Sequence, residues 1–319
     1  MRRLTTIGIA SGIAGNHIGC EQGPVVLKAS TWLEAAVKEQ GFVLDWLPML
    51  TVNPDLATID AVSELCARAS VLSQNLTQQQ KPFIFLGGDH SNAMGIWQGA
   101  MSALLPKKLG LIWIDAHMDA HTFVTSLSGN IHGMPIAGLL GQADPKLRTV
   151  YGDGPFLTPE CLALIGVRSF EKAEHALLQK LNILHIPMAQ VTTQKNLSDA
   201  LNKAVKHVLK RASYFAFSID LDAIDPQDAP AVSMPEPGGI SGAALCAALH
   251  QFNNDPHCLG LEIAEYSPEF DKKNKTQHLI AGLIGALYGV SRTPNRSLGS
   301  AGDGIKSTSW PIFNSKARR

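Results

Sequence analysis

The chain has 319 residues, of which 45% are hydrophobic and 17% are charged, so it is long and apolar enough to bury a sizeable core. It carries 27 Lys and Arg residues and 27 Asp and Glu residues. This formal net charge of zero argues against nucleic acid or an anionic membrane as a partner. No stretch reaches the roughly 18 apolar residues that a membrane span needs.

Short apolar runs and apolar residues at helical spacing alternate along the chain. Strands are expected at Leu4–Ala10, Phe42–Leu47, Phe83–Leu86, Leu109–Asp115, Cys161–Val167, Ile183–Ile186, Tyr214–Ile219 and Leu259–Ile263. Helices are expected from Pro24 to Gly41, through Val62–Leu76 and Leu197–Val208, and from the capping residues Ser241 and Thr276 onward. The alternation predicts an α/β fold, a three-layer α/β/α sandwich whose central, mainly parallel sheet has about eight strands.

Residues 1–319 are expected to form a single domain, because the sequence has no internal repeat and no low-complexity linker. After Val290 the chain turns rich in Ser, Gly and Pro, although Trp310 and Phe313 add apolar side chains near its end. We therefore expect residues 290–319 to form an extended tail that either contacts a neighbouring subunit or frays.

The cysteines and the first residues indicate the compartment. The five cysteines are odd in number, scattered and never arranged as CxxC, which fits reduced thiols better than a disulfide framework. The opening MRRLTTIGIASGIAG lacks the long apolar core of a secretory signal and is expected to contain the first strand. The sequence therefore predicts a cytoplasmic location.

The stretch from Leu109 to His121 reads LGLIWIDAHMDAH, and its apolar half predicts a strand buried on both faces. Asp115, His117 and Asp119 follow at positions i, i+2 and i+4. On extended backbone such residues point to the same side, so we expect them to converge past the strand's end, where open α/β sheets bind ligands. Packed together without a cation they would repel each other and be costly to desolvate, which predicts a divalent metal.

Two other predicted strands end in residues of the same kinds. His90 follows FIFLGGD, and Asp220 and Asp222 follow YFAFSI. Four carboxylates and two imidazoles are too many for a tetrahedral zinc site, but they suit two ions that share carboxylates, and manganese is the metal expected for these donors. We therefore predict two Mn²⁺ per subunit, a pair that can hold a bridging hydroxide and lower the pKa of its parent water.

The motifs GGDHS, DAHMD, SGNIHGMP, SIDLDAIDP and IAEYSP resemble the arginase family of ureohydrolases in order and approximate spacing. The likeness runs from EQGPVVL to about Tyr288, nearly the whole chain. It implies an arginase-like fold, a dimanganese centre and hydrolysis of a guanidino C–N bond. Arginase is the nearest member, which implies conversion of L-arginine and water to L-ornithine and urea. The resemblance also implies a homo-oligomer, because family members usually form trimers or hexamers.

The resemblance assigns the metal ligands by position. One ion would be bound by His90, Asp115, Asp119 and Asp220. The other would be bound by Asp115, His117, Asp220 and Asp222. Asp115 and Asp220 would therefore bridge the two ions.

Three residues are expected to act during the reaction. The metal-bridging hydroxide would attack the guanidinium carbon, and Asp119 would orient it by a hydrogen bond. Glu265 matches the family glutamate that pairs with the guanidinium, a planar group suited to two-point contact with a carboxylate. His132 matches the histidine proposed to shuttle a proton to the leaving amine, a role that imidazole suits near neutral pH.

The far end of the substrate is expected to meet two loops. Ser128 and Asn130, in SGN, resemble the arginase loop that binds the substrate's α-carboxylate. Glu171 falls where arginases place an aspartate facing the α-amino group, and Glu174 lies one helical turn further on. These matches favour an α-amino acid substrate.

Two departures weaken that assignment. His121 stands where arginases usually carry an asparagine that contacts the substrate carboxylate, and it is expected to bind substrate there. Met234 stands where they usually carry a threonine, and VSMPEPGG is closer to agmatinase and formimidoylglutamase sequences. Agmatinase, formimidoylglutamase or another guanidino-acid hydrolase therefore stays open as an alternative.

Proteins of other classes fit less well. A zinc deacetylase of the related fold would need one metal and would lack the ligands His90 and Asp119. A calcineurin-type phosphoesterase would carry a later Gly-Asn-His-Glu, which is absent from the sequence. A non-catalytic metal-binding or regulatory protein on the same fold would be expected to have lost ligands, and none of the six is missing.

Overall fold

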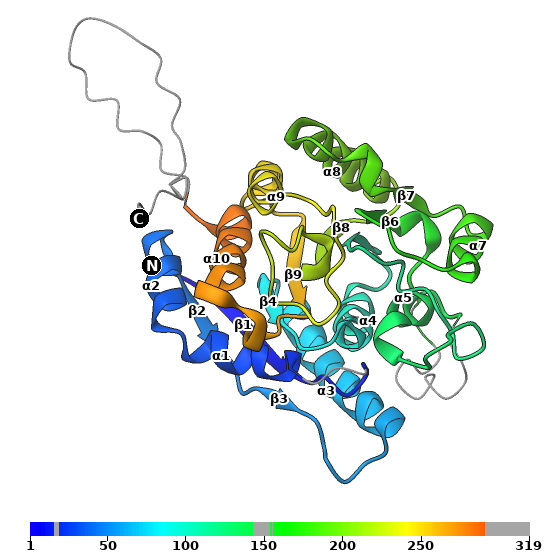
Figure 1. The fold of residues 1–319 in the computed structure, drawn as a ribbon, viewed down its shortest axis with the longest axis horizontal. Helices are drawn as coiled ribbons and strands as arrows, with labels where there is room; N and C mark the ends of the chain where they lie inside the picture. Colours follow the sequence, from blue (N-terminus) through cyan, green and yellow to red (C-terminus); the bar gives the residue numbers. More distant parts are fainter. Residues whose placement is uncertain (16–18, 143–153, 155, 291–319) are drawn as a thin grey trace, which may run out of the picture.

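The computed structural model describes residues 1–15, 19–142, 154 and 156–290, and a nine-stranded sheet runs through this part of the chain (Figure 1). The strands are β1 (Arg2–Ala10), β2 (Phe42–Trp46), β3 (Leu50–Thr51), β4 (Phe83–Leu86), β5 (Leu109–Ile114), β6 (Leu162–Ile165), β7 (Leu184–Ile186), β8 (Tyr214–Asp220) and β9 (Cys258–Ala264). They lie in the order β2-β1-β4-β9-β8-β5-β6-β7, with β3 paired to β1, and all these pairs are parallel.

The predicted α/β sandwich with a parallel sheet is confirmed. All eight predicted strands form, and each begins and ends within two residues of the expected bounds. The ninth, β3, was not predicted, because a two-residue strand carries no periodicity that a sequence pattern can reveal.

Helices cover both faces of the sheet. One face packs against α1 (Gly23–Ala29), α2 (Thr31–Glu39), α8 (Gln194–Val208), α9 (Gly242–Leu249) and α10 (Lys275–Tyr288). The other packs against α3 (Thr58–Gln78), α4 (Ala93–Leu104), α5 (Pro135–Leu139) and α7 (Lys172–Lys180). Ile112 and Ile114 of β5 point into the first core, and Leu111 and Trp113 point into the second. This alternation explains why LGLIWI reads as one continuous apolar run.

The helix predicted from Pro24 to Gly41 is in fact two helices. Ser30 ends α1 and also caps α2, because its Oγ accepts a hydrogen bond from the Leu33 backbone N–H at 3.0 Å. The apolar spacing continues across this break, so periodicity alone could not reveal it.

The predicted capping residue of the last helix is also corrected. Ser241 caps α9 as expected, but α10 begins at Lys275 and Thr276 does not cap it. The Thr276 hydroxyl instead accepts a hydrogen bond from the backbone N–H of Ala231 at 3.1 Å. A hydroxyl near a helix start can therefore serve a neighbouring loop rather than the helix itself.

The strand order decides where the site lies. Four strands in the middle of the sheet, β4, β9, β8 and β5, are neighbours, although the chain reaches them in the order β4, β5, β8, β9. Because the sheet is parallel, their carboxyl ends share one edge. Segments far apart in the sequence therefore leave the sheet side by side, at the edge where α/β proteins bind ligands.

Three other predictions concern the chain as a whole. The predicted tail 290–319 lies outside the described residues, except for Val290. All five cysteines lie within the described part and are free thiols. In that part of the chain, no helix is long and apolar enough to cross a membrane.

Candidate active site

His90 leaves the sheet after β4, where two loops come into close contact. A Cβ atom on Gly88 would lie 1.6 Å from the carbonyl oxygen of Ser11, so only glycine lets the loop after β1 approach this point. Asp89 then caps a short 3-10 turn, because its Oδ1 accepts a hydrogen bond from the Ser91 backbone N–H at 3.2 Å. This turn begins at His90, which therefore lies at the carboxyl end of β4, near the middle of the sheet.

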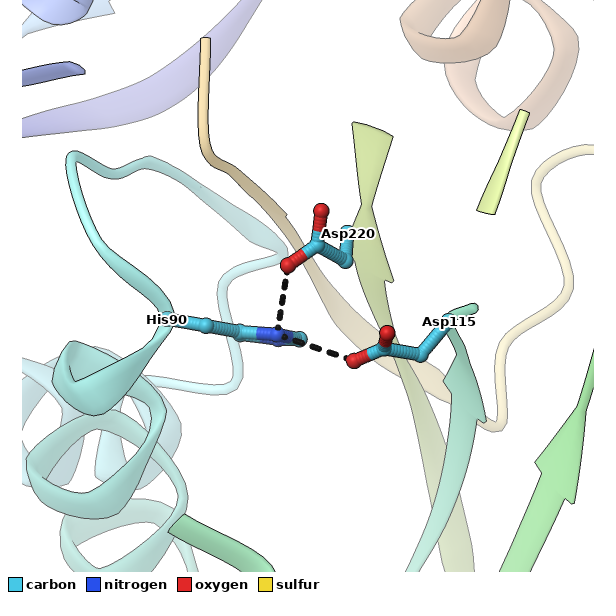
Figure 2. Close-up of side chains that lie close together, drawn as sticks. All are labelled: His90, Asp115 and Asp220. Atoms are coloured by element: carbon cyan, nitrogen blue, oxygen red, sulfur yellow. Dashed lines mark ion pairs between the residues drawn. The ribbon is translucent and has the colours of Figure 1, made fainter. Parts of the chain in front are cut away.

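The imidazole of His90 faces three carboxylates. Its Nδ1 lies 3.3 Å from Asp115 Oδ2, 3.2 Å from Asp119 Oδ2 and 3.2 Å from Asp220 Oδ2. Figure 2 shows the ring pointing between Asp115 and Asp220. All four side chains are buried, yet His90 Nδ1 and Asp119 Oδ2 have no hydrogen-bond partner among the described residues. Buried polar atoms rarely stay unpaired, so the arrangement fits a cation between them.

A second group of ligands shares Asp115. His117 Nδ1 lies 2.9 Å from Asp222 Oδ2 and 3.6 Å from Asp115 Oδ1. Asp115 therefore turns one oxygen toward each histidine, an arrangement that would allow it to bridge two ions. Asp220 turns only Oδ2 toward His90, because its Oδ1 accepts a hydrogen bond from the Asp222 backbone N–H at 2.8 Å. We call His90, Asp115, His117, Asp119, Asp220 and Asp222 the ion-ligand cluster.

The cluster converges through turns rather than through strand alternation. Strand β5 ends at Ile114, and Asp119 has a φ of 47°, in the left-handed region that residues other than glycine seldom adopt. Asp222 lies in the 3-10 turn Leu221–Ala223, which Asp220 caps. The expectation that these residues share one side of an extended backbone was therefore wrong, although their side chains do reach one centre.

Charge indicates what the cluster can hold. With all four carboxylates ionised, its net charge would be −2 even when both imidazoles are protonated. Burial raises the pKa of Asp119 to about 7, and also raises the pKa values of Asp220 and Asp222. Two like charges 4 Å apart repel by about 4 kcal/mol at an effective dielectric of 20. Two divalent cations would relieve this repulsion, and ions that accept both oxygen and nitrogen donors suit the site.

Side chains that the sequence analysis missed support these ligands. His90 Nε2 lies 2.9 Å from Ser218 Oγ, and that hydroxyl donates a hydrogen bond to Glu262 Oε2 at 2.7 Å. The Trp113 ring stacks on His90, and its Nε1–H donates to Asp115 Oδ2 at 2.8 Å. The one acidic residue inside LGLEIA, an otherwise apolar strand, was the signal that could have revealed Glu262.

Glu265 follows β9 and contacts both His90 and His132. Its Oε1 accepts a hydrogen bond from the His90 backbone N–H at 2.9 Å and lies 3.4 Å from His132 Nδ1. Burial disfavours a charged His132, but the Glu265 carboxylate outweighs this effect and raises the pKa of His132 to about 9. His132 is therefore protonated near neutral pH and can donate a proton to a leaving amine.

All members of the ion-ligand cluster except Asp115 line a pocket of about 390 Å³, together with His132 and Glu265, and this volume suits a small-molecule substrate. The predicted substrate-binding residues Ser128 and Asn130 lie at its mouth, on the long loop after β5. The described lining residues include no Lys or Arg, whereas four glutamates line the pocket. The electrostatic field of such a pocket favours a cationic substrate. A larger cavity, of about 580 Å³, lies at the amino ends of the strands and contains none of the predicted site residues.

At the rim, His121, Glu171 and Glu174 form what we call the rim cluster. His121 Nε2 lies 2.7 Å from Glu171 Oε2 and 3.2 Å from Glu174 Oε2, and its Nδ1 lies 3.1 Å from Thr125 Oγ1. Hydrogen bonding to Glu174, supported by Glu171, raises the pKa of His121 to about 9. Both ring nitrogens thus face protein groups, so a substrate can bind His121 only by displacing one of them.

Three residues of VSMPEPGG, Val232, Met234 and Glu236, also line this pocket. Met234 was singled out as a departure from the arginase pattern, and 46% of its surface is exposed. Glu236 was missed, yet its Oε1 lies 3.6 Å from His117 Nε2. An acidic residue two positions from Met234 in the same motif was the signal that could have found it.

Comparison with known proteins identifies the family. The sequence model of the Arginase family matches residues 3–289. The chain belongs to the arginase family. The arginase of Bacillus caldovelox is 30% identical over 298 residues, which cover 91% of this chain and 99% of that protein. The structure of native Bacillus caldovelox arginase superposes with a TM-score of 0.84 at 28% identity, covering 92% of this chain and 100% of the other.

The arginase-family assignment inferred from the motifs is thereby confirmed. A structure of Bacillus subtilis formimidoylglutamase also superposes, with a TM-score of 0.71 at 20% identity over 90% of this chain and 86% of that one, a likeness in fold alone. As a member of the arginase family, the protein is a metal-dependent hydrolase of guanidino C–N bonds.

Proposed function

We propose that the protein hydrolyses L-arginine to L-ornithine and urea with two bound Mn²⁺ ions. The observation that carries the proposal is the ion-ligand cluster, in which His90, His117 and four aspartates meet at a pocket whose described lining residues include no Lys or Arg. The relatives named arginase, at about 30% identity over nearly the whole chain, support arginine as the substrate.

The ligands divide into two sets. We propose that the first ion is held by His90, Asp115, Asp119 and Asp220, and that the second is held by Asp115, His117, Asp220 and Asp222. The unpaired, buried Nδ1 of His90 supports the first set, and the approach of His117 to Asp115 and Asp222 supports the second. When bound, the pair of ions would lower the pKa of a water molecule and so supply a nucleophile at neutral pH.

We propose that side chains of this protein bind the guanidinium, orient the attacking water and donate the proton. The buried Glu265 carboxylate would accept hydrogen bonds from the guanidinium and hold its plane across the cluster. The Asp119 carboxylate would also accept a hydrogen bond from the attacking water and orient it. As the C–N bond to the alkyl amine breaks, His132 would donate its proton to the departing nitrogen, because its raised pKa keeps it protonated at pH 7.

The substrate's amino acid end would lie at the rim. Ser128 and Asn130 would donate hydrogen bonds to the α-carboxylate, and Glu171 would accept hydrogen bonds from the α-ammonium group. Glu174 is less available, because its two oxygens accept hydrogen bonds from the backbone N–H groups of Ala120, at 3.1 Å, and Glu171, at 3.0 Å.

One observation favours a second candidate function. His121 already pairs with Glu171, so an α-ammonium group must compete with an imidazole for the same carboxylate. A guanidino or formimino acid whose carboxylate approaches the protonated His121 would avoid this competition. Hydrolysis of such an acid is therefore the alternative that this observation favours.

A product-release assay on the manganese-loaded protein tests the proposal. Urea is measured with arginine, agmatine, guanidinobutyrate and guanidinopropionate as substrates, and formamide is measured with formimidoylglutamate. We expect arginine to give the highest kcat/KM. If arginine is inert while a substrate lacking the α-amino group turns over, the proposed role of Glu171 is wrong and the alternative stands.

We further propose that the protein assembles as a homo-oligomer, a trimer or hexamer, in the cytoplasm. The family assignment supports this assembly by analogy. Size-exclusion chromatography with light scattering tests the assembly, and a monomer at micromolar concentration would contradict it.

A further inference from the structure

We propose that Glu236 is a positioning residue that orients His117 for the second ion. This inference rests on the proposed function, because it assigns His117 Nδ1 to a bound metal. Glu236 lies on the loop between η6 (Leu221–Ala223) and α9, outside the ion-ligand cluster and outside every role assigned above.

The two nitrogens of His117 face different partners. Nδ1 faces the carboxylates of Asp222 and Asp115, whereas Nε2 lies 3.6 Å from Glu236 Oε1. A neutral imidazole that binds a metal through Nδ1 must carry its proton on Nε2. The Glu236 carboxylate lies beside this nitrogen, and a small side-chain rotation would bring the pair within hydrogen-bond distance. An acceptor in this position fixes the ring orientation and makes the coordinating nitrogen more basic.

The loop that carries Glu236 is held against the end of β8 by one guanidinium group. Arg168 Nη2 donates hydrogen bonds to the carbonyl oxygens of Glu236, at 2.6 Å, and Asp222, at 2.7 Å. Arg168 Nε donates to the carbonyl oxygen of Pro237 at 3.1 Å. The backbone of Glu236 and the backbone of a proposed metal ligand are therefore tied to the same side chain, which keeps the Glu236 carboxylate beside His117.

The other histidine of the cluster has a partner of the same kind. His90 Nε2 contacts Ser218, whose hydroxyl donates to Glu262, so a carboxylate stands behind this ring through one intervening hydroxyl. The Glu236 carboxylate, by contrast, lies beside His117 Nε2 with no intervening hydroxyl. The difference fits the burial, because His90 is 1% exposed whereas the side chains of His117 and Glu236 are 28% and 29% exposed. A charged carboxylate is easier to keep at the partly hydrated site.

Two variants and a matched control test the inference. Glu236→Ala removes the acceptor, and Glu236→Gln keeps an acceptor oxygen but removes the charge. Glu160→Gln makes the same chemical change at an exposed residue before β6, away from the pocket. Mn²⁺ is titrated into each metal-free protein without substrate, and binding is followed by calorimetry and by the electron paramagnetic resonance signal of spin-coupled manganese pairs.

For Glu236→Ala we expect the affinity for one of the two ions to fall about 10–100-fold, the usual effect of losing an acceptor behind a ligating histidine. The affinity for the other ion and the unfolding temperature of the metal-free protein should not change. For Glu236→Gln, the affinity for the affected ion should lie between that of Glu236→Ala and that of the unaltered protein. Excess Mn²⁺ should restore the spin-coupled signal and most of kcat.

Unchanged affinity for both ions in Glu236→Ala would overturn the inference. A higher KM with unchanged ion binding would also overturn it, and would assign Glu236 to the substrate instead. The titration needs no turnover, so it separates this inference from the proposed function. If no guanidino substrate is hydrolysed, the proposed function fails, whereas the role of Glu236 is still decided by ion binding.

Discussion

The floor and the rim of the pocket differ in what holds their side chains in place. At the floor, the side chains follow three of the four central strands, β4, β8 and β5, and most of them are buried; Asp115 is 0% exposed. At the rim, the side chains project from loops and one helix start, and the Glu171 side chain is 59% exposed. A floor residue is therefore constrained by the whole sheet, whereas a rim residue is constrained mainly by its immediate partners.

This difference separates chemistry from specificity. If the floor binds the ions as proposed, changing one of its ligands should remove an ion and leave buried charges unpaired, so the reaction should stop. Changing a rim residue leaves the sheet and the ion-ligand cluster intact, so only the choice of substrate should shift. Loops carried on a rigid scaffold commonly vary in this way.

The largest effect is expected from Asp220→Ala, at the floor. Because a metal centre supplies several kcal/mol of transition-state stabilisation, we expect turnover to fall by about 1000-fold or more. The Mn²⁺ content, measured by elemental analysis, should fall below two ions per subunit. Asp199→Ala, at an exposed residue of α8, is the control and should change neither. Full metal content in Asp220→Ala would contradict its role as a ligand.

His132→Asn should slow turnover by about 100-fold, the typical contribution of a positioned proton donor. Both ions should stay bound, because His132 contacts Glu265 and lies outside the two ligand sets. His257→Asn, at an exposed histidine, provides the comparison. An unchanged kcat would contradict the proposed role of His132 as a proton donor. Loss of metal would indicate instead that His132 helps to bind the ions.

Metal binding should strengthen as pH rises. Burial opposes protonation of His90 and His117, but the surrounding carboxylates outweigh it and raise both pKa values above the usual range. In the metal-free protein both rings therefore carry a proton that must leave before an ion binds. Apparent Mn²⁺ affinity should rise about tenfold per pH unit for each proton released. Calorimetry in buffers of different ionisation enthalpy counts the protons released on Mn²⁺ binding. If no proton is released, the raised pKa values of His90 and His117 are contradicted.

The smallest effect is expected at the rim, from His121→Asn. This change frees Glu171 from its imidazole partner, so the KM for arginine should fall about fivefold while kcat stays nearly constant, a gain of about 1 kcal/mol. Guanidinobutyrate, which has no amino group, serves as the internal control and should gain nothing. If both substrates respond equally, the rim cluster does not discriminate between them.

The sequence singled out the candidate ligands through a local contrast. Strands buried on both faces read as continuous apolar runs, and the Asp and His residues that end them stand out against that background. The same contrast placed His90, Asp115 and Asp220 at strand ends, where the structure brings them together. The backbone geometry was not predicted, because the left-handed turn at Asp119 leaves no periodic signal.

By itself, the sequence determined the alternation of strands and helices and the residue types at three strand ends, because burial and charge are written into local composition. The tertiary structure alone decided three sets of contacts. Ser218 contacts His90 and donates a hydrogen bond to Glu262, Glu236 lies beside His117, and His121 pairs with Glu171. These contacts join segments that become neighbours only through the strand order and loop packing. Apolar runs specify that strands form, but they do not specify which strand lies beside which, and the side-chain partners depend on that order.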